Sequence, residues 1–310
     1  LTLLGGGELN YRYSGNNLVS FTDQNGAETR YQYDSQGRMT AWYDANGKRQ
    51  VFNRYDSQDR VTAQTDAAGG RYRMEYADGH TVTTDAEGNT VTYYYDERKR
   101  TTRIVDALGG ETAFTYGENG EIVSETDPLG NVTTYAYNAA GDLTATVLPN
   151  GGSILREYDA NHNLTRLQDL NGGVTTYAYD ENGNLTAETA PDGGVTRYAY
   201  DHKGRMVEKT NALGGVTRYE YVNGKLVKTI DPLGNETGYA YDASGNMTAL
   251  TDALGHVTLL AYDAKGNLLC QTFADGTAVS YTYDGLGNRT SMTDPLGNVT
   301  RYKYDAMGRL

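Results

Sequence analysis

The sequence predicts an all-β protein, built from about fifteen hairpin repeats that form one continuous antiparallel sheet, coiled as a spiral into a partial shell or barrel. Three observations support this prediction: a motif that recurs with a fixed period, a composition rich in tyrosine and glycine, and two turn signals in every repeat. The motif is Tyr-x-Tyr-Asp-x-x-Gly, followed by an apolar residue and threonine. Clear copies begin at Tyr177 and Tyr239.

The period is close to 21 residues, because the steps between successive copies run from 19 to 22 and most are 21. The second tyrosines of the copies are Tyr13, Tyr33, Tyr55, Tyr76, Tyr95, Tyr116, Tyr137, Tyr158, Tyr179, Tyr200, Tyr221, Tyr241, Tyr262, Tyr283 and Tyr304. Repeats of this size bury their apolar faces only against neighbouring repeats. No stretch longer than one repeat lies outside the pattern. Residues 1–310 are therefore predicted to be one array, and a fragment of a longer protein because the pattern starts and stops within a repeat.

The composition favours strands and turns. The chain has 28 Tyr against 4 Phe and 1 Trp, and 38 Gly. Tyrosine prefers sheets and offers a large ring with a polar tip. Low-complexity disorder is the alternative interpretation, and the regular turn chemistry argues against it.

The charge argues against several classes of partner. The chain has 27 basic and 40 acidic residues, which gives a net charge of −13. Nucleic acid binding needs clustered Lys and Arg, so no nucleic acid partner is expected. No segment has the length or hydrophobicity of a membrane span, and no membrane insertion is expected. The single cysteine, Cys270, rules out an internal disulfide.

Each repeat contains two turn signals about ten residues apart. We call the turn after the tyrosines, such as Asp242–Gly245, the first turn, and the other, such as Asp231–Gly234, the second turn. Asp at the first position, Pro at the second and Gly at the fourth are typical of a type I turn. The Asp-Pro-Leu-Gly copies beginning at Asp127, Asp231 and Asp294 meet all three preferences. The aspartate carboxylate is expected to accept backbone N–H groups and so to nucleate the turn.

The segments between turns have ordinary strand length. Asn131–Tyr137 and Asp142–Val147 are predicted strands, paired antiparallel because their connections are short. By alternation, Thr133, Tyr135 and Tyr137 share one face of the first strand. Leu143, Ala145 and Val147 are expected to share a face of the second.

A sheet of roughly thirty strands is expected to coil, because open sheets beyond about ten strands curl or split. Tyrosines two strands apart are expected to stack into ladders that hold the coil. A β-helix is the competing solenoid. It is disfavoured because it stacks parallel strands and has little need of two Asp-x-x-Gly turns per coil.

The motif resembles the YD repeat of the Rhs family of bacterial polymorphic toxins and their relatives. Two segments carry the resemblance most clearly: Gly193–Met206 (Gly-Gly-Val-Thr-Arg-Tyr-Ala-Tyr-Asp-His-Lys-Gly-Arg-Met) and Gly297–Leu310 (Gly-Asn-Val-Thr-Arg-Tyr-Lys-Tyr-Asp-Ala-Met-Gly-Arg-Leu). The resemblance covers essentially the whole chain.

The resemblance implies more than the period does. Rhs proteins and insecticidal toxin-complex components coil such repeats into a hollow shell around a C-terminal toxin of the same polypeptide, and teneurins use a similar barrel in adhesion. In the bacterial family, a segment after the repeats releases the toxin with aspartates in an Asp-Pro-x-Gly-Leu-type motif. That segment is not recognisable in residues 1–310, which are therefore expected to be shell without the cleavage segment and without the toxin domain. The Asp-Pro-Leu-Gly copies are interpreted as turns because they recur in phase with the repeats.

No catalytic, cofactor-binding or metal-binding residues are predicted, and the chain is predicted not to be an enzyme. The histidines, His80, His162, His202 and His256, occupy different repeat positions without metal-ligand spacing. Cys270 has no charged cluster beside it in the sequence and is interpreted as a small residue on a strand face. Gly5–Gly7 lacks the strand-then-helix context of a phosphate-binding loop. Rows of equivalent aspartates are an alternative calcium site, but each has a turn to cap.

Two functions are consistent with the sequence. The first is a shell segment that shields a toxin domain of the same polypeptide, secreted or at the bacterial cell surface. It implies that toxin domain, and a spike component of a contact-dependent secretion system, as partners. The second is a cell-surface or wall-associated adhesin whose tyrosine rings bind glycans.

Overall fold

The computed structural model describes residues 9–23, 26–304 and 310. Within this part of the chain all regular structure is strand, and no helix is found. The strands are β1 (Asn10–Ser14), β2 (Asn17–Thr22), β3 (Glu28–Tyr33), β4 (Met39–Tyr43), β5 (Arg49–Tyr55), β6 (Val61–Asp66), β7 (Arg71–Ala77), β8 (His80–Thr84), β9 (Thr90–Tyr95), β10 (Thr101–Val105), β11 (Glu111–Tyr116), β12 (Ile122–Thr126), β13 (Val132–Tyr137), β14 (Leu143–Val147), β15 (Ser153–Tyr158), β16 (Leu164–Gln168), β17 (Val174–Tyr179), β18 (Leu185–Thr189), β19 (Val195–Tyr200), β20 (Met206–Thr210), β21 (Val216–Val222), β22 (Lys225–Ile230), β23 (Glu236–Tyr241), β24 (Met247–Thr251), β25 (Val257–Tyr262), β26 (Leu268–Thr272), β27 (Ala278–Tyr283), β28 (Arg289–Thr293) and β29 (Val299–Arg301).

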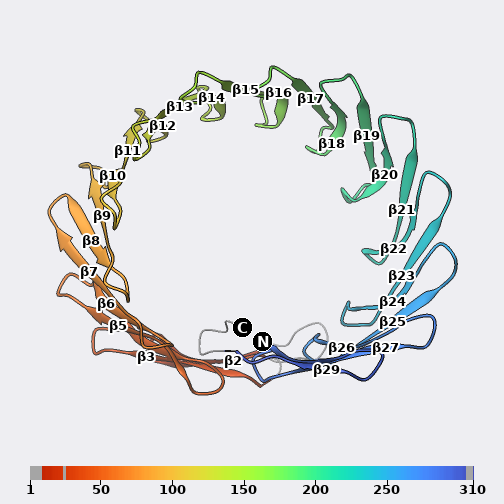
Figure 1. Cartoon of the computed structure of the whole chain (residues 1–310), viewed down its shortest axis with the longest axis horizontal. Coiled ribbons are helices and arrows are strands. Elements are labelled where there is room, and N and C mark those ends of the chain that lie inside the picture. The colour runs from red at the N-terminus through yellow and green to blue at the C-terminus, as the bar shows by residue number, and fades with distance from the viewer. Residues whose placement is uncertain (1–8, 24–25, 305–309) are drawn as a thin grey trace. The chain divides into compact units, whose positions relative to one another are not determined.

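The chain divides into two compact units. The first holds residues 1–76, 82–90 and 238–310, and the second holds residues 77–81 and 91–237. In the second unit β9 to β22 form an antiparallel meander in which each strand pairs with its sequence neighbours. Figure 1 shows these strands following one another in sequence order. In the first unit, β1 to β7 and β23 to β29 pair in the same way. The antiparallel pairing confirms the predicted fold class and contradicts a parallel β-helix.

The register within one repeat confirms most of the predicted strand faces. Tyr135 lies opposite Thr146, and Ala136 lies opposite Ala145. Side chains of directly opposed residues point to the same side of a sheet, so two faces can be followed from strand to strand. We call them the tyrosine face, which carries Tyr135 and Tyr137, and the alternate face, which carries Ala136. Burial alternates accordingly along β13, where the tyrosine-face residues are half-buried and the others exposed.

The prediction for Leu143 is wrong. Ala145 and Val147 share the alternate face, but Leu143 lies opposite Tyr137, because the register shifts between Ala136 and Tyr137. This shift is a β-bulge, in which two residues of one strand oppose one residue of its partner. It places Leu143 on the tyrosine face.

Both predicted turns are present in each typical repeat. In the first turn Asp180–Gly183, the N–H of Gly183 donates to the Asp180 carbonyl at 3.1 Å, and the N–H of Asp180 donates to the Asn184 carbonyl at 3.0 Å. The second turn Asp231–Gly234 repeats this pattern at 3.0 and 2.9 Å. The fourth-position glycines adopt left-handed backbone, with φ of 81° at Gly183 and 84° at Gly234. This conformation explains why glycine recurs there.

The core is thin. Among the described residues, Ala41 is the one fully buried apolar side chain, and the buried polar residues are Ser20, Asp44 and Asn53. Most strand residues are half-buried. Stability in such an array comes from many partly buried contacts between adjacent repeats rather than from one central core.

The predicted tyrosine ladders are not formed. The ring pairs found in the described part of the chain are Tyr11 with Phe21 and His80 with Tyr94, and neither joins two tyrosines. Strands two apart in a sheet are separated by about 9.6 Å, whereas ring centroids interact at 4.5–7 Å. The strand between successive tyrosines therefore separates their rings.

Two features from the sequence lie outside the described residues: Gly5–Gly7, and the first turn of the final repeat, Asp305–Gly308. In the ranges that the structure does describe, no helix is long and apolar enough to span a bilayer.

Candidate functional site: the seam between repeats

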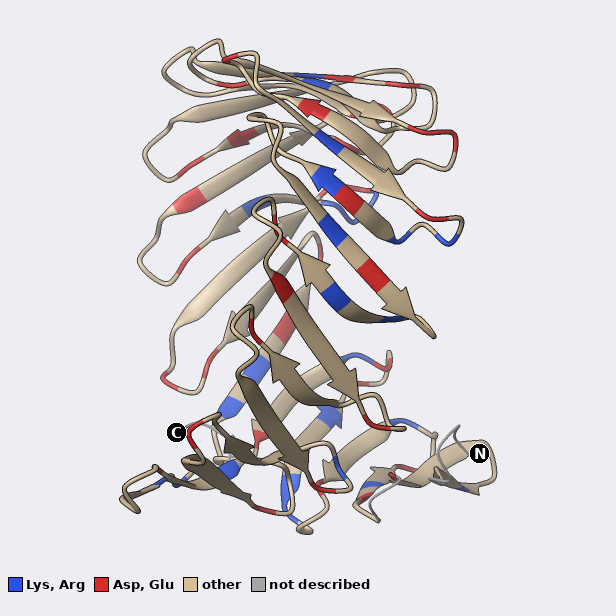
Figure 2. Cartoon of the chain, turned by 90° about the vertical axis from the view of Figure 1, so that its right-hand side faces the viewer, with Lys and Arg blue, Asp and Glu red and all other residues tan. Residues whose placement is uncertain are grey.

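The aspartate of each typical turn caps its own backbone. In the first turn Asp180–Gly183, Oδ1 of Asp180 accepts the N–H groups of Asn182 and Asn184, both at 2.9 Å, and Oδ2 accepts Asn184 Nδ2 at 2.9 Å. The Asn184 amide and these N–H groups lower the pKa of Asp180. Figure 2 shows acidic residues at successive turns. The capping role predicted for the aspartates is confirmed.

We call the boundary between adjacent repeats, such as the one between β12 and β13, the seam. Its two strands are paired through their backbones only at one end. β12 and β13 share three opposed pairs near the second turn, from Thr126 opposite Val132 to Ser124 opposite Thr134. Toward the first turn the backbone pairing stops, and the hydroxyl of Tyr137 donates to the carbonyl of Ile122 at 3.0 Å. The hydroxyl thus bridges two repeats where the backbones separate.

This tyrosine bridge recurs along the chain. At least nine second tyrosines donate to a backbone carbonyl of the preceding repeat, at distances of 2.5–3.1 Å. The donors are Tyr33, Tyr55, Tyr76, Tyr116, Tyr137, Tyr158, Tyr179, Tyr283 and Tyr304. The motif therefore requires tyrosine, because phenylalanine has the ring without the donor.

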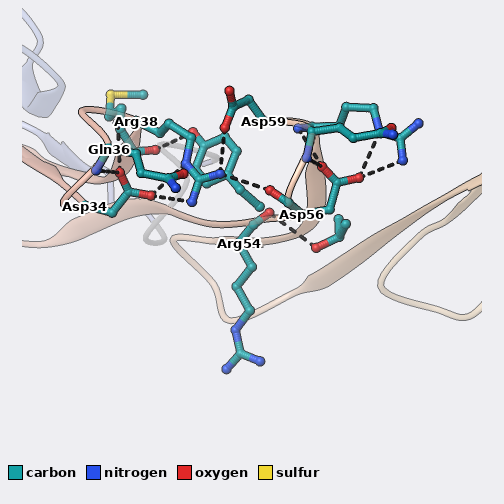
Figure 3. Close-up of polar contacts among 11 residues, drawn as sticks. Asp34, Gln36, Arg38, Arg54, Asp56 and Asp59 are labelled. Carbon is teal, nitrogen blue, oxygen red and sulfur yellow. Dashed lines mark hydrogen bonds and ion pairs between the residues drawn. The ribbon is translucent and has the colours of Figure 1, made fainter.

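An arginine four residues after the aspartate adds a second link between repeats (Figure 3). Arg38 Nε donates to Asp34 Oδ2 of its own turn at 2.7 Å. Its Nη1 donates to the Asp56 carbonyl at 2.9 Å and to Asp59 Oδ1 at 2.8 Å, both in the next repeat. The guanidinium also lies 4.8 Å from the ring centroid of Tyr55, a cation–π distance. One side chain thus ties two first turns together.

The same position carries arginine in other repeats. Arg60, Arg100 and Arg205 lie 4.3, 4.4 and 4.8 Å from the rings of the next second tyrosines, which are Tyr76, Tyr116 and Tyr221. The Arg205 guanidinium, followed by backbone N–H groups, lowers the pKa of Asp201 to about 2. Asparagine replaces arginine at Asn163, Asn184, Asn246, Asn267 and Asn288 and bonds only its own turn's aspartate through its side chain.

The histidines lie in separate repeats and have different neighbours. His162 Nδ1 lies 2.7 Å from Asp142 Oδ1 of the preceding repeat, and His256 Nδ1 lies 2.9 Å from Asp252 Oδ2 of its own turn. His80 lies beside the Tyr94 ring. Cys270 is a free thiol near Thr272. No group of three or more His, Cys, Asp or Glu side chains in the described residues is arranged to hold a metal ion.

A polar hollow of 550 Å³ opens between two adjacent first turns. Its lining includes Asp180, Asn182, Tyr200, Asp201 and His202. It lies at the end of the hairpins where adjacent strands separate. The hollow presents carboxylates, amides and one tyrosine ring, but no nucleophile paired with a base.

The residues that join the repeats were not predicted from the sequence. Neither the hydroxyl bridge nor the arginine link was predicted, although Gly-Arg or Gly-Asn recurs after the first turn, as at Gly37-Arg38, Gly204-Arg205 and Gly183-Asn184. The recurrence of these dipeptides at the same position of the repeat is the signal that indicates a shared structural role for the arginine or asparagine. Its partners lie in the next repeat, so the register had to be known first.

Solved structures contain the same fold. The chain aligns over 98% of its length with a crystal structure of TcdB2-TccC3 without its hypervariable C-terminal region, with a TM-score of 0.75 and 19% identity. It aligns over 97% with TcdB2-TccC3 (TM-score 0.60, 18% identity) and with a Photorhabdus luminescens Tc holotoxin pore (TM-score 0.60, 17% identity). The chain spans about a fifth of each matched chain, between 19% and 21%.

Fold and seam together define a structural β-repeat protein, in which the recurrent side chains hold neighbouring repeats together. The RHS Repeat family matches residues 13–49, 34–71, 95–128, 116–153, 158–195, 179–216, 222–257, 262–299 and 290–310. The chain therefore belongs to the RHS repeat family. No curated protein matches it by sequence comparison.

Proposed function

We propose that residues 1–310 are a wall segment of a bacterial polymorphic toxin, part of a shell that shields a toxin domain at the C-terminal end of the same polypeptide until delivery. The observation that carries this proposal is the seam. Adjacent repeats are joined by backbone pairs at one end, and at the other end at least nine of the junctions carry a tyrosine hydroxyl bridge. Four arginines, Arg38, Arg60, Arg100 and Arg205, lie over the second tyrosine of the next repeat. Repeats joined in this way would form a continuous wall within each unit.

The geometry of the seam favours coiling. Adjacent repeats pair through backbone near the second turn, while toward the first turn the separation is spanned by a side chain. A sheet whose strands are closer at one edge than at the other curves as repeats are added, and the inherent strand twist adds to this curvature. The likeness to TcdB2-TccC3, whose structure was determined without its hypervariable C-terminal region, is consistent with the same architecture.

The partners follow from this proposal. They are the C-terminal toxin domain of the parent polypeptide and a spike component of a secretion system, with the protein secreted or at the bacterial surface. The chain's role is then steric, and no residue of it acts as a catalyst.

The test uses the parent polypeptide with its native flanking segments. We expect the segment that follows the array to survive a broad-specificity protease in the wild type, and to be digested in a Tyr137→Ala/Tyr158→Ala/Tyr179→Ala variant. The exposed-surface variant Leu233→Ser is the control, because Leu233 is 87% exposed. Digestion of that segment in the wild type, at the rate seen when it is produced alone, would contradict shielding.

A glycan-binding adhesin is the second candidate, and one observation favours it. The hollow between first turns combines the Tyr200 ring with carboxylate and amide groups. An aromatic ring can stack on the apolar face of a sugar, while the polar groups accept or donate hydrogen bonds to its hydroxyls. Against it, many second tyrosines are half-buried and donate their hydroxyls within the wall. A glycan array probed with wild type and Tyr200→Ala distinguishes the two. Saturable binding lost in the variant supports the adhesin.

A further inference from the structure

The alternate face of β5, β6 and β7 forms a groove with a small-residue floor. On β6, Ala63 lies between Arg54 of β5 and Arg73 of β7. Thr65, two residues along, lies between Phe52 and Arg71. Short side chains on the middle strand and long ones on both flanks leave a trough of 760 Å³ along β6.

The walls of this groove carry more arginines than carboxylates. Arg54 and Arg71 are exposed and form no ion pair with any described residue. Arg73 approaches Glu75 only at 3.7 Å, and both side chains are more than 60% exposed. Figure 3 shows the Arg54 side chain pointing away from the contacts around Arg38 and Asp56. Arg49, also in the lining, lies over the Phe52 ring at 5.0 Å.

Three arginines on the same face of the second unit are paired with carboxylates. Arg103, Arg166 and Arg218 each have a glutamate of an adjacent strand within 3.2 Å, namely Glu111, Glu157 and Glu208. These three arginines thus bind a carboxylate presented by the neighbouring strand, whereas Arg197 of β19, opposite Ala187 and Thr210, forms no ion pair with any described residue. Along β6, Arg54 and Arg71 have no such partner, and the one glutamate near the groove, Glu75, approaches Arg73 from the same strand at 3.7 Å.

The groove also lies in a distinct part of the charge distribution. Residues 1–76 contain nine basic and nine acidic residues, so the net charge of −13 arises entirely from residues 77–310. The four arginines in this groove are therefore a local concentration of positive charge, because the segment as a whole is neutral.

We propose that this groove binds an acidic polypeptide segment in extended conformation along β6, with its carboxylates paired to Arg54, Arg71 and Arg73. Strands two apart lie about 9.6 Å from each other, which leaves room for one extended chain between the flanking side chains. Arg71 and Arg73 are two residues apart on one strand, or about 6.7 Å, the spacing of alternate side chains in an extended peptide. Guanidinium groups pair with carboxylates through two parallel hydrogen bonds, and Phe52 adds apolar contact.

The test is fluorescence anisotropy with a labelled peptide that alternates glutamate with threonine, and a glutamine-threonine peptide as the uncharged probe. We expect saturable binding of the acidic peptide to the whole chain, weakened by increased salt. Arg54→Gln/Arg71→Gln/Arg73→Gln should reduce affinity by about tenfold or more. The control Arg103→Gln/Arg166→Gln/Arg218→Gln removes equal charge from arginines that already have partners, and should bind within about twofold of wild type.

A second variant tests the groove without changing charge. Ala63→Phe fills the floor and should weaken binding of the acidic peptide while leaving all arginines in place, and the smaller substitution Ala63→Leu serves if that variant folds poorly. Equal loss in the two triple variants, or no saturable binding by wild type, would overturn the proposal. Displacement of the peptide by an oligothymidylate of equal charge at lower concentration would also overturn it, because the site would then select phosphates.

Discussion

The second tyrosine of each repeat contributes a ring and a hydroxyl, which can be tested separately. Tyr179 donates to the Leu164 carbonyl at 2.9 Å while its ring is half-buried on the tyrosine face. The ring covers apolar neighbours, and the hydroxyl satisfies a carbonyl that the separated backbones leave without a strand partner. The residue thus serves packing and backbone satisfaction at once.

Tyr179→Phe should lower the free energy of unfolding by about 1 kcal/mol, the usual net contribution of one hydrogen bond, plus part of the cost of an unpaired carbonyl. Tyr179→Ala should cost about 2–4 kcal/mol, because ring contacts are lost as well, and the ring is only half-buried. Thermal melts followed by circular dichroism measure both. If the two variants melt together with wild type, the tyrosine seam does not hold the array.

In two of the first turns whose fourth position is not glycine, the residue there contacts a side chain of the preceding repeat. Asp59 (φ 62°) bonds Arg38, and His162 (φ 66°) bonds Asp142. The left-handed conformation costs a non-glycine residue about 1–2 kcal/mol. A bond across the seam offsets part of that cost.

Asp59→Asn should remove the ion pair with Arg38 while keeping a residue that tolerates left-handed backbone. Because Asp59 is 71% exposed, the expected loss of stability is small, about 0.2–1 kcal/mol, and should disappear in high salt. Denaturant melts at two salt concentrations provide the measurement. Gln58→Asn, in the same exposed turn but outside the ion pair, is the control; a loss independent of salt would contradict the electrostatic explanation.

At the scale of the hairpin, the turns decide where strands end and which faces they present. The bulge beside each first turn moves one residue out of alternation, so Leu143 joins Tyr137 while Ala145 remains opposite Ala136. A one-residue shift reverses the faces of all following residues, and its recurrence at every typical first turn keeps the repeats in phase.

Two Gly→Ala substitutions distinguish turn glycine from strand glycine. Gly234→Ala should destabilise by about 1–2 kcal/mol, because φ is 84° there and alanine resists that conformation. Gly238→Ala, in β23, should be neutral or stabilise by up to about 1 kcal/mol, since its new Cβ would meet Thr251 Cβ at an ordinary 3.6 Å. Chemical unfolding of both variants checks this. Equal effects would show that backbone conformation is not what selects glycine at Gly234.

Over the whole molecule, capped aspartates make stability depend on pH. Hydrogen bonds lower the pKa of many turn aspartates, including Asp127, Asp159, Asp180 and Asp231, and the pKa of Asp201 falls from 3.8 to about 2. A pKa lowered in the folded state adds stability that is fully present above about pH 4 and is lost as pH falls through the folded value.

The melting temperature should therefore fall steeply between about pH 4 and pH 2. Asp201→Asn should lower the melting temperature at neutral pH, where the charged pair with Arg205 is lost, and should reduce the fall in acid. Glu181→Gln controls for the loss of one negative charge at an exposed turn position. A pH profile for Asp201→Asn that parallels that of wild type would contradict the contribution of this pair.

Much of the architecture could be predicted from sequence, because each repeat is short and its signals are local. Asp at the start and Gly at the end of a turn act through backbone groups within four residues, so strand and turn positions such as Val132–Tyr137 and Asp231–Gly234 follow from the motif. The predicted tyrosine ladder was wrong because strands two apart in a sheet lie about 9.6 Å from each other, beyond the distance at which aromatic rings interact.

The sequence by itself determined the period, the two turns and the antiparallel order of strands. Only the tertiary structure decided the register of neighbouring repeats, and with it the hydroxyl bridge of Tyr137 to Ile122, the link of Arg38 to Asp56 and the arginine groove along β6. The physical reason is distance along the chain. Turn chemistry acts within a few residues, whereas the bridges of Tyr137 and Arg38 join residues 15 to 21 positions apart, and their partners depend on how the strands align.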